Sequence, residues 1–223
     1  MEKHVIYQRI ATSLHEIDKL SRLLYAMSST DIHRYPDNYE VLSMEAAIRA
    51  EKNACRLRHL VFQSSRIKKR EYLKSAAEAM KISVSYCDGV LKVVIPGLMP
   101  RRKQSQSTEF LLDPLYYAMN SFMDKQHHLP RYRECVVHFL QEYDANLPSR
   151  RVRDYDNLEL KQVLDIITAF ALVDDGGLLC DMHNSSRFAD EDRTVICVMK
   201  KDDFPRWLAA QYGEKGIGFE PEK

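Results

Sequence analysis

Four aspartates have the clearest capacity for chemistry in this sequence. Asp154 and Asp156 stand two residues apart just before a helical pattern, and Asp174 and Asp175 follow that pattern at its end. In an extended segment, residues i and i+2 project to the same side, so the first two carboxylates can converge on one point. Asp175 joins them if the strand after the helix packs back against the helix start. Three clustered carboxylates repel one another unless a cation lies between them, and oxygen ligands favour a hard ion such as Mg²⁺.

Basic residues stand directly before these aspartates. Arg150, Arg151 and Arg153 carry guanidinium groups, which fit phosphate oxygens in a fork geometry. Lys161, early in the helix, can neutralise charge that develops on a phosphate or a leaving oxygen. A second basic segment, Arg101-Arg102-Lys103, lies in a polar loop. Metal-binding acids flanked by arginines suit phosphodiester hydrolysis, because the metal activates water and neutralises charge on the scissile phosphate.

The same residues also have a purely structural interpretation. Asp156-Asn157 is good chemistry for a helix N-cap, and Asp174-Asp175-Gly176-Gly177 is good chemistry for a turn. An ion pair between Arg153 and Asp154 at the surface would contribute little to stability. Under this interpretation Asp154→Ala changes stability alone, and the residues themselves leave both interpretations open.

Residues 1–80 predict a helical extension. Apolar residues recur every three or four positions from Ile6 to Met27, which lays one stripe along a helix. A turn at Tyr35-Pro36-Asp37-Asn38 precedes a second helix that starts near Tyr39. The short connector between them predicts an antiparallel helical hairpin. A third helix is predicted from about Lys69 to Met80.

Residues 81–223 predict an α+β domain with a mixed, mainly antiparallel sheet and helices on one face. Asp88-Gly89 is a hairpin signal between the first two strands. Asp113-Pro114 is typical of a helix N-cap followed by the first helical residue. The central helix is expected to run to Val173. The predicted strands are Ile82–Tyr86, Val90–Ile95, Glu134–Gln141, and a pair formed by Leu178–His183 and Thr194–Met199, before a closing helix at Phe204–Tyr212.

Composition limits the kinds of partner and the cellular compartment that are expected. The net charge of +1, from 33 basic and 32 acidic residues, means that any nucleic-acid partner must be held by a local basic patch. The five cysteines include no Cys-x-x-Cys pair, which favours a reducing cytoplasm over a disulfide framework or a zinc site. The first residues lead into an amphipathic helix and no run approaches a membrane span, so no membrane partner is expected.

The central stretch resembles the RusA family of Holliday junction resolvases. The matching pattern is a basic run, then Asp154-x-Asp156-Asn157-Leu158, a lysine early in the helix, and Asp174-Asp175 before a short strand. The element order from about Val90 to Met199 also looks like that fold, a small α+β domain that dimerises. By this resemblance Asp154, Asp156 and Asp175 are the catalytic acids that act with Mg²⁺, Asp174 is the alternative ligand, and a helix lysine assists. The family's lysine lies four residues after the second aspartate, where this chain has Leu160, and Lys161 follows it.

The resemblance implies an Mg²⁺-dependent endonuclease that cleaves branched DNA such as Holliday junctions, acting as a homodimer with two symmetric sites. The basic residues of both segments would hold backbone phosphates. A second hypothesis is a catalytically degenerate RusA-like module that binds DNA or protein. Residues 1–80 have no counterpart in the compact family members, and the helical hairpin is the candidate surface for a protein partner.

Overall fold

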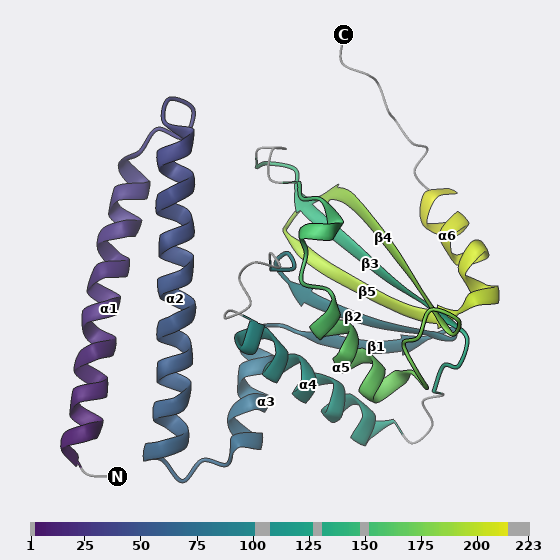
Figure 1. The fold of residues 1–223 in the computed structure, drawn as a ribbon, viewed down its shortest axis with the longest axis horizontal. Helices are drawn as coiled ribbons and strands as arrows, with labels where there is room; N and C mark the ends of the chain where they lie inside the picture. Colours follow the sequence, from purple (N-terminus) through teal and green to yellow (C-terminus); the bar gives the residue numbers. More distant parts are fainter. Residues whose placement is uncertain (1–2, 101–107, 127–130, 148–151, 214–223) are drawn as a thin grey trace. The chain divides into compact units, whose positions relative to one another are not determined.

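The computed structural model describes residues 3–100, 108–126, 131–147 and 152–213. It divides into two compact units, Met1–Ser75 with Gln104–Asp113, and Ala76–Lys103 with Pro114–Lys223. Helices make up the first unit, and the second holds a five-stranded sheet with its own helices (Figure 1). The predicted class, α+β with an N-terminal helical hairpin, is confirmed.

The hairpin consists of α1 (Lys3–Ser29) and α2 (Pro36–Ser64). Between the two helices, Arg49 Nη1 donates to Glu16 Oε2 at 2.9 Å, and Ser13 and Ala46 are buried. The second helix begins three residues earlier than its predicted start near Tyr39. Pro36 explains the difference, because proline has the backbone angle of the first helical turn and needs no hydrogen-bond acceptor there.

The helices α3 (Lys69–Ala79) and α4 (Thr108–Lys125) connect the units in sequence. The predicted N-cap at Asp113 is wrong, because α4 begins before it and Pro114 lies inside the helix. A proline there removes one backbone hydrogen bond, which packing elsewhere must offset. The Asp113 carboxylate instead accepts a hydrogen bond from Arg58 at 3.4 Å, with the Lys69 ammonium at 3.9 Å.

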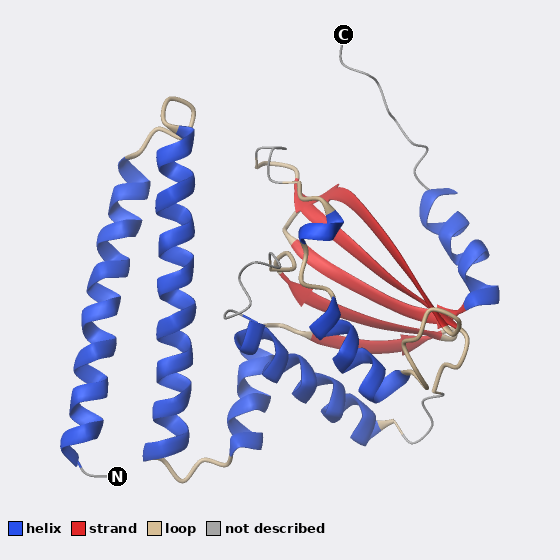
Figure 2. Cartoon of the chain, viewed as in Figure 1, coloured by secondary structure: helices blue, strands red, loops and turns tan. Residues whose placement is uncertain are grey.

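All five strands belong to one sheet (Figure 2). Their order is β1-β2-β5-β3-β4, in which β3 and β4 are parallel and the other neighbours are antiparallel. The predicted pairing of the last two strands with each other is wrong, because β3 lies between them. The strands are β1 (Ser83–Cys87), β2 (Val90–Pro96), β3 (Cys135–Asp144), β4 (Cys180–Ala189) and β5 (Arg193–Lys200).

The Asp88-Gly89 turn forms the predicted hairpin between β1 and β2. Both residues have a positive φ, 50° at Asp88 and 79° at Gly89. Two consecutive residues in this region match the twist of the flanking strands, and glycine enters it without steric cost. The Gly89 carbonyl accepts a hydrogen bond from the Tyr132 hydroxyl at 2.7 Å, which ties the turn to the segment before β3.

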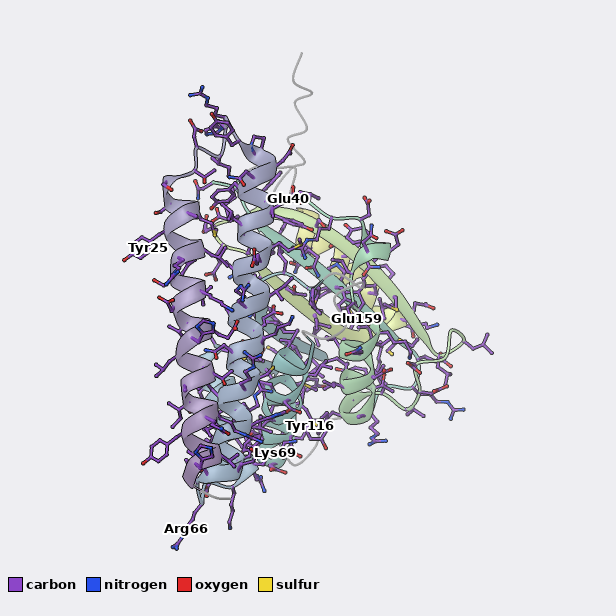
Figure 3. The ribbon with its side chains drawn as sticks, turned by 60° about the vertical axis from the view of Figure 1, so that its left-hand side comes forward. Tyr25, Glu40, Arg66, Lys69, Tyr116 and Glu159 are labelled. Atoms are coloured by element: carbon purple, nitrogen blue, oxygen red, sulfur yellow. The ribbon has the colours of Figure 1, made fainter. Side chains whose placement is uncertain are left out.

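Helices cover the two faces of the sheet unequally. The α4 and α5 (Lys161–Ala171) helices lie together across one face (Figure 1), and the Tyr116 ring of α4 (labelled in Figure 3) packs 4.8 Å from the Phe170 ring of α5. The α6 helix (Phe204–Gly213) packs Phe204 and Trp207 against the opposite face, so the prediction that the helices lie on one face is wrong for α6. We call these the α4–α5 face and the α6 face. Among the helices that the structure describes, none is both long enough and apolar enough to cross a membrane.

Candidate functional site

Asp154 and Asp156 lie in an exposed turn between β3 and α5. Asp154 precedes a single 3₁₀ turn, η3 (Tyr155–Asn157), and Asp156 lies within it. The turn is anchored on both sides of Asp154, because the Arg153 N–H donates to the Tyr143 hydroxyl at 3.0 Å and the Tyr155 hydroxyl donates to Ser186 Oγ at 3.0 Å. The structure therefore fixes the backbone under two carboxylates that face solvent.

The capping interpretation of these residues is wrong for the central helix. The helix α5 starts only at Lys161, with Leu160 as its N-cap, and it has no side-chain capping bond. Asp154 is the N-cap of η3, also without a side-chain capping bond. Leu158 and Leu160 are buried, and the extended backbone at Leu158 separates η3 from α5. Lys161 is the first residue of α5, at the position predicted to lie one turn inside.

The second aspartate pair lies beyond the other end of α5. Asp174 is exposed and Asp175 is partly buried, and both precede β4. The Gly176 carbonyl accepts hydrogen bonds from the N–H groups of Leu179 and Cys180, which turns the chain into the strand. A Cβ atom at Gly176 would lie 2.8 Å from Asp174 Oδ2, so the glycine allows that carboxylate to approach the backbone closely.

The structure does not gather Asp154, Asp156 and Asp175 into one group. The η3 turn is tied to Ser186 of β4, whereas Asp175 acts electrostatically on Cys180 at the start of the same strand. About 20 Å of extended chain separates Cys180 from Ser186. Across the described residues, no three His, Cys, Asp or Glu side chains form a group that could hold a metal ion. The Mg²⁺ site therefore stays a prediction from the sequence.

Lys161 connects the two ends of this region electrostatically. Its ammonium donates to Asp165 Oδ1 at 3.0 Å. The pKa of Lys161 is raised, first by this hydrogen bond, then by the charge of Asp165, and further by the charge of Asp175. Asp165, one turn along α5, binds the ammonium directly, whereas Asp175, beyond the end of the helix, acts on it through its charge alone. A lysine at this position is suited to binding an anion, but its ammonium already binds the Asp165 carboxylate.

Few of the predicted phosphate contacts fall on described residues. Arg101, Arg102, Lys103, Arg150 and Arg151 lie outside the described ranges. Arg153 is described, and its guanidinium Nη1 donates to the Met99 carbonyl at 2.8 Å. That bond directs one nitrogen of the Arg153 guanidinium toward the protein.

The structure reveals a second polar cluster, which the sequence interpretation missed, on the α6 face. A cavity of about 1010 Å³ lies over this face, and Trp207 of α6 lines it beside Leu140 and Val195 of the sheet. Glu142 on β3 stands opposite Arg187 on β4 and Arg193 on β5 in the strand register. His138 on β3 stands opposite His183 and Cys197 in the same way.

Glu142 is a buried carboxylate held by two guanidinium groups. Arg187 Nε donates to one of its oxygens at 2.7 Å, and Arg193 Nε donates to the other. Burial raises the pKa of Glu142, but the hydrogen bonds from Arg193 and Arg187 outweigh burial, so the net pKa lies below the ordinary value. The carboxylate stays ionised although its side chain has no exposed surface.

His138 is buried beside aromatic rings. Its Nε2 lies 2.6 Å from Ser185 Oγ, and its ring centroid lies 5.2 Å from that of Trp207. Burial lowers the pKa of His138 to about 4, with further contributions from His183 and Arg187. Its Nδ1 has no hydrogen-bond partner among the residues that the structure describes. The signal available in the sequence was the alternation of polar His138 and Glu142 with apolar neighbours along β3.

Comparison with known proteins identifies a family for the whole chain. A family model described as a family of unknown function, DUF6100, matches residues 2–218. This chain belongs to DUF6100. Its membership covers the hairpin and the sheet unit together, so the N-terminal helices are a regular part of DUF6100 proteins. No curated protein matches the sequence.

Similarity to a solved structure is weak. The periplasmic domain of Helicobacter pylori MotB matches with a TM-score of 0.31 and 11% identity, covering 62% of this chain and 90% of that domain. A likeness of this size carries no functional argument.

Proposed function

We propose that this DUF6100 protein is an Mg²⁺-dependent endonuclease that cleaves branched DNA such as Holliday junctions and acts as a homodimer. The sequence resemblance to RusA resolvases supports the proposal through Asp154, Asp156 and Asp175. Support from the structure is the presentation of Asp154 and Asp156 on an anchored, exposed turn directly before α5.

The observation that carries the proposal is the presentation of Asp154 and Asp156 on one exposed turn a few residues before Lys161, the first residue of α5. Asp175 lies beyond the other end of α5, and its charge makes a minor contribution to the raised pKa of Lys161. A lysine beside these carboxylates offers a compact positive charge for a phosphate oxygen. Lys161 in this role would neutralise charge on the phosphate oxygens.

The donor chemistry of the aspartates fits Mg²⁺, and their spacing in the structure does not complete a site. Asp154 and Asp156 offer oxygen ligands on one turn, whereas Asp175 lies toward the start of β4. When bound, Mg²⁺ would activate water and neutralise charge on a phosphate. The residues of this chain would hold the ion and orient the phosphate. The basic residues at 101–103 and 150–151, with Arg153, are proposed to hold the DNA backbone.

Cleavage of a synthetic four-way DNA junction in the presence of Mg²⁺ tests the proposal. The parent is expected to cut the junction, and Asp156→Asn is expected to reduce the rate about 100-fold or more through loss of a carboxylate ligand. Asp18→Asn is the matched control, because Asp18 is an exposed aspartate of α1 that forms a surface ion pair with Arg22 at 2.9 Å. An inactive parent on junctions of several sequences would sink the proposal.

A second candidate is a catalytically degenerate RusA-like module that binds DNA or protein. The observation that favours it is the hydrogen bond that holds Lys161 on Asp165, together with the separation of Asp175 from Asp154 and Asp156. Titration calorimetry with MgCl₂ separates the candidates. Junction binding without any heat of Mg²⁺ binding would favour the module.

We further propose a cytoplasmic location. The five cysteines support it, because none forms a disulfide bond in the structure and three of them, Cys135, Cys180 and Cys197, are buried. Free, buried cysteines are typical of proteins in a reducing compartment.

A further inference from the structure

The α1–α2 hairpin has an internal interface whose positions can be read from its contacts. Ser13 on α1 and Ala46 and Asn53 on α2 are buried. Glu16 on α1 receives the hydrogen bond from Arg49 on α2 at 2.9 Å, which brings the middle parts of the two helices side by side. These five residues define the inner sides of the two helices.

A row of exposed apolar side chains runs along α1, next to the side of the helix that contacts α2. Leu14 and Ile17 directly follow the inner residues Ser13 and Glu16, and their side chains are 61% and 45% exposed. The spacing alternates between three and four residues, as on a helix that packs against another helix. We call this set the α1 row, and it consists of Tyr7, Ile10, Leu14, Ile17 and Leu24.

A matching row of mainly small residues runs along α2. Ala47, Ala50 and Ala54 directly follow the inner residues Ala46, Arg49 and Asn53. The same alternating spacing continues toward the end of α2, where Leu57 is 41% exposed. We call this set the α2 row, and it consists of Ala47, Ala50, Ala54, Leu57 and Val61.

Both rows lie on the same side of the hairpin. Two antiparallel helices are related by a two-fold axis perpendicular to the plane that contains them. This rotation keeps each face of the hairpin on its own side. Residues that lie one position after the inner residues therefore fall on the same face of both helices. The α1 row and the α2 row therefore form one apolar face, raised along α1 and hollow along α2. Tyr25, next to the α1 row, is 74% exposed and projects from α1 away from α2 (Figure 3).

The shape of this face selects its occupant. A second copy related by a two-fold axis parallel to the helices packs each α1 row against the α2 row of the other copy. This rotation does not shift the helices along their length. Since the Arg49–Glu16 bond brings the middle of α1 beside the middle of α2, Leu14 and Ile17 meet the alanine part of the α2 row, residues 47–54, on the other copy. In this middle part of the face, large side chains pack against small ones, as in packing of knobs into holes.

The available area is sufficient for a stable dimer. The helix α1 has 27 residues. At about 1.5 Å per residue and about 20 Å across two packed helices, the face covers roughly 800 Å². A standard protein interface buries about 800 Å² on each partner. Exposed apolar side chains gathered on a face of this size are typical of interaction sites.

We propose that two copies of this chain associate through the α1–α2 hairpins, which form an antiparallel four-helix bundle with each α1 row packed on the α2 row of the other copy. The inference rests on the hairpin alone. It names the interface of the homodimer in the proposed function, and the two proposals fail in distinguishable ways, because sedimentation measures association and junction cleavage measures activity.

Sedimentation of the full chain over a concentration series tests the dimer. The parent is expected to sediment as a dimer, and Leu14→Lys is expected to raise the dimer Kd about 100-fold by placing a charge in the interface. Val41→Lys is the matched control, because Val41 is 56% exposed on the opposite side of α2 and should leave Kd unchanged. Circular dichroism of each variant establishes that its helices are intact.

Exchange of large and small residues tests the packing of α1 on α2. Leu14→Ala leaves an empty space in the interface, and Ala50→Leu places a large side chain in the space that Leu14 fills in the parent. Each variant alone is therefore expected to weaken the dimer. The double variant is expected to recover at least half of the combined loss in log Kd, because the two positions face each other across the interface. Additive losses would overturn this arrangement, and a parent that stays monomeric at all concentrations would overturn the dimer itself.

Discussion

Two sets of polar residues in the sheet unit are placed in opposite ways. The aspartates around α5 lie in turns, where Asp154 and Asp156 face solvent. The polar residues of the α6 face lie within strands, where Glu142 and His138 are buried and bonded to neighbours on the adjacent strands. The exposed aspartates are therefore available to a ligand and contribute little to stability. The buried polar residues of the strands are part of what stabilises the sheet.

The largest expected effect concerns His138 and pH. The pKa of His138 in the folded chain is about 4, below its ordinary value of 6.5, so the unfolded chain takes up the proton first. Its contribution is complete above pH 6.5 and is lost as the pH falls toward 4. The free energy of unfolding should therefore drop by up to about 3 kcal/mol across this range. In His138→Phe this part of the decline should disappear, as measured by urea unfolding at several pH values.

His33→Phe is the control for this measurement, because His33 is exposed in the turn between α1 and α2. The variant should keep the pH dependence of the parent. If His138→Phe also kept it, His138 would not be the group that takes up the proton on unfolding, and the proposed contrast between buried and exposed sets would be broken.

A smaller effect is expected for Glu142→Gln. The substitution keeps the shape of the side chain but removes the charge that Arg187 and Arg193 bond, so the free energy of unfolding at pH 7 should fall by about 2 kcal/mol. Because the pKa of Glu142 lies below its ordinary value, its stabilisation is present above that ordinary value and is lost as the pH falls through the folded pKa. Parent and variant should therefore converge in acid. Glu191→Gln, at an exposed residue 3.5 Å from Arg193, should change little.

The smallest effect is expected for Asp154→Ala. A lost helix cap would cost about 1 kcal/mol. Asp154 makes no capping bond in η3 and its side chain is exposed, so the free energy of unfolding should change by less than about 0.5 kcal/mol. Chemical denaturation measures this directly. A loss of about 1 kcal/mol or more would show that the aspartates stabilise the turn, and it would remove the contrast with the α6 face.

The sequence predicted those parts of the fold that depend on local residues. Asp88-Gly89 specifies its turn, and the three- and four-residue spacing from Ile6 to Met27 specifies α1. Strand partners depend on residues far apart in the chain, which is why the position of β3 between β4 and β5 could not be predicted. The start of α5 was misplaced because Leu158 is buried with an extended backbone, which outweighs its helical propensity.

The candidate site was predictable to the same extent. The placement of Asp154 and Asp156 in a turn before a helix followed from the local pattern. Whether Asp175 lies near Asp154 and Asp156 depended on the direction of β4. Because β4 pairs in parallel with β3, β4 and the preceding Asp175 begin at the same edge of the sheet as the start of β3. His138 and Glu142 escaped notice because a polar residue in a strand carries no motif until its neighbours on adjacent strands are known.

The ten-residue strand β4 ends the sheet order on one side, next to β3. A long outer strand of apolar residues invites other chains to add strands to it and so to aggregate. Here the sequence from Asp181 to Arg187 is Asp-Met-His-Asn-Ser-Ser-Arg, with charged and amide side chains that weaken such pairing. Three of these residues, Ser185, Ser186 and Arg187, also line the cavity on the α6 face, so they serve the cavity and at the same time protect the molecule from uncontrolled growth of its sheet.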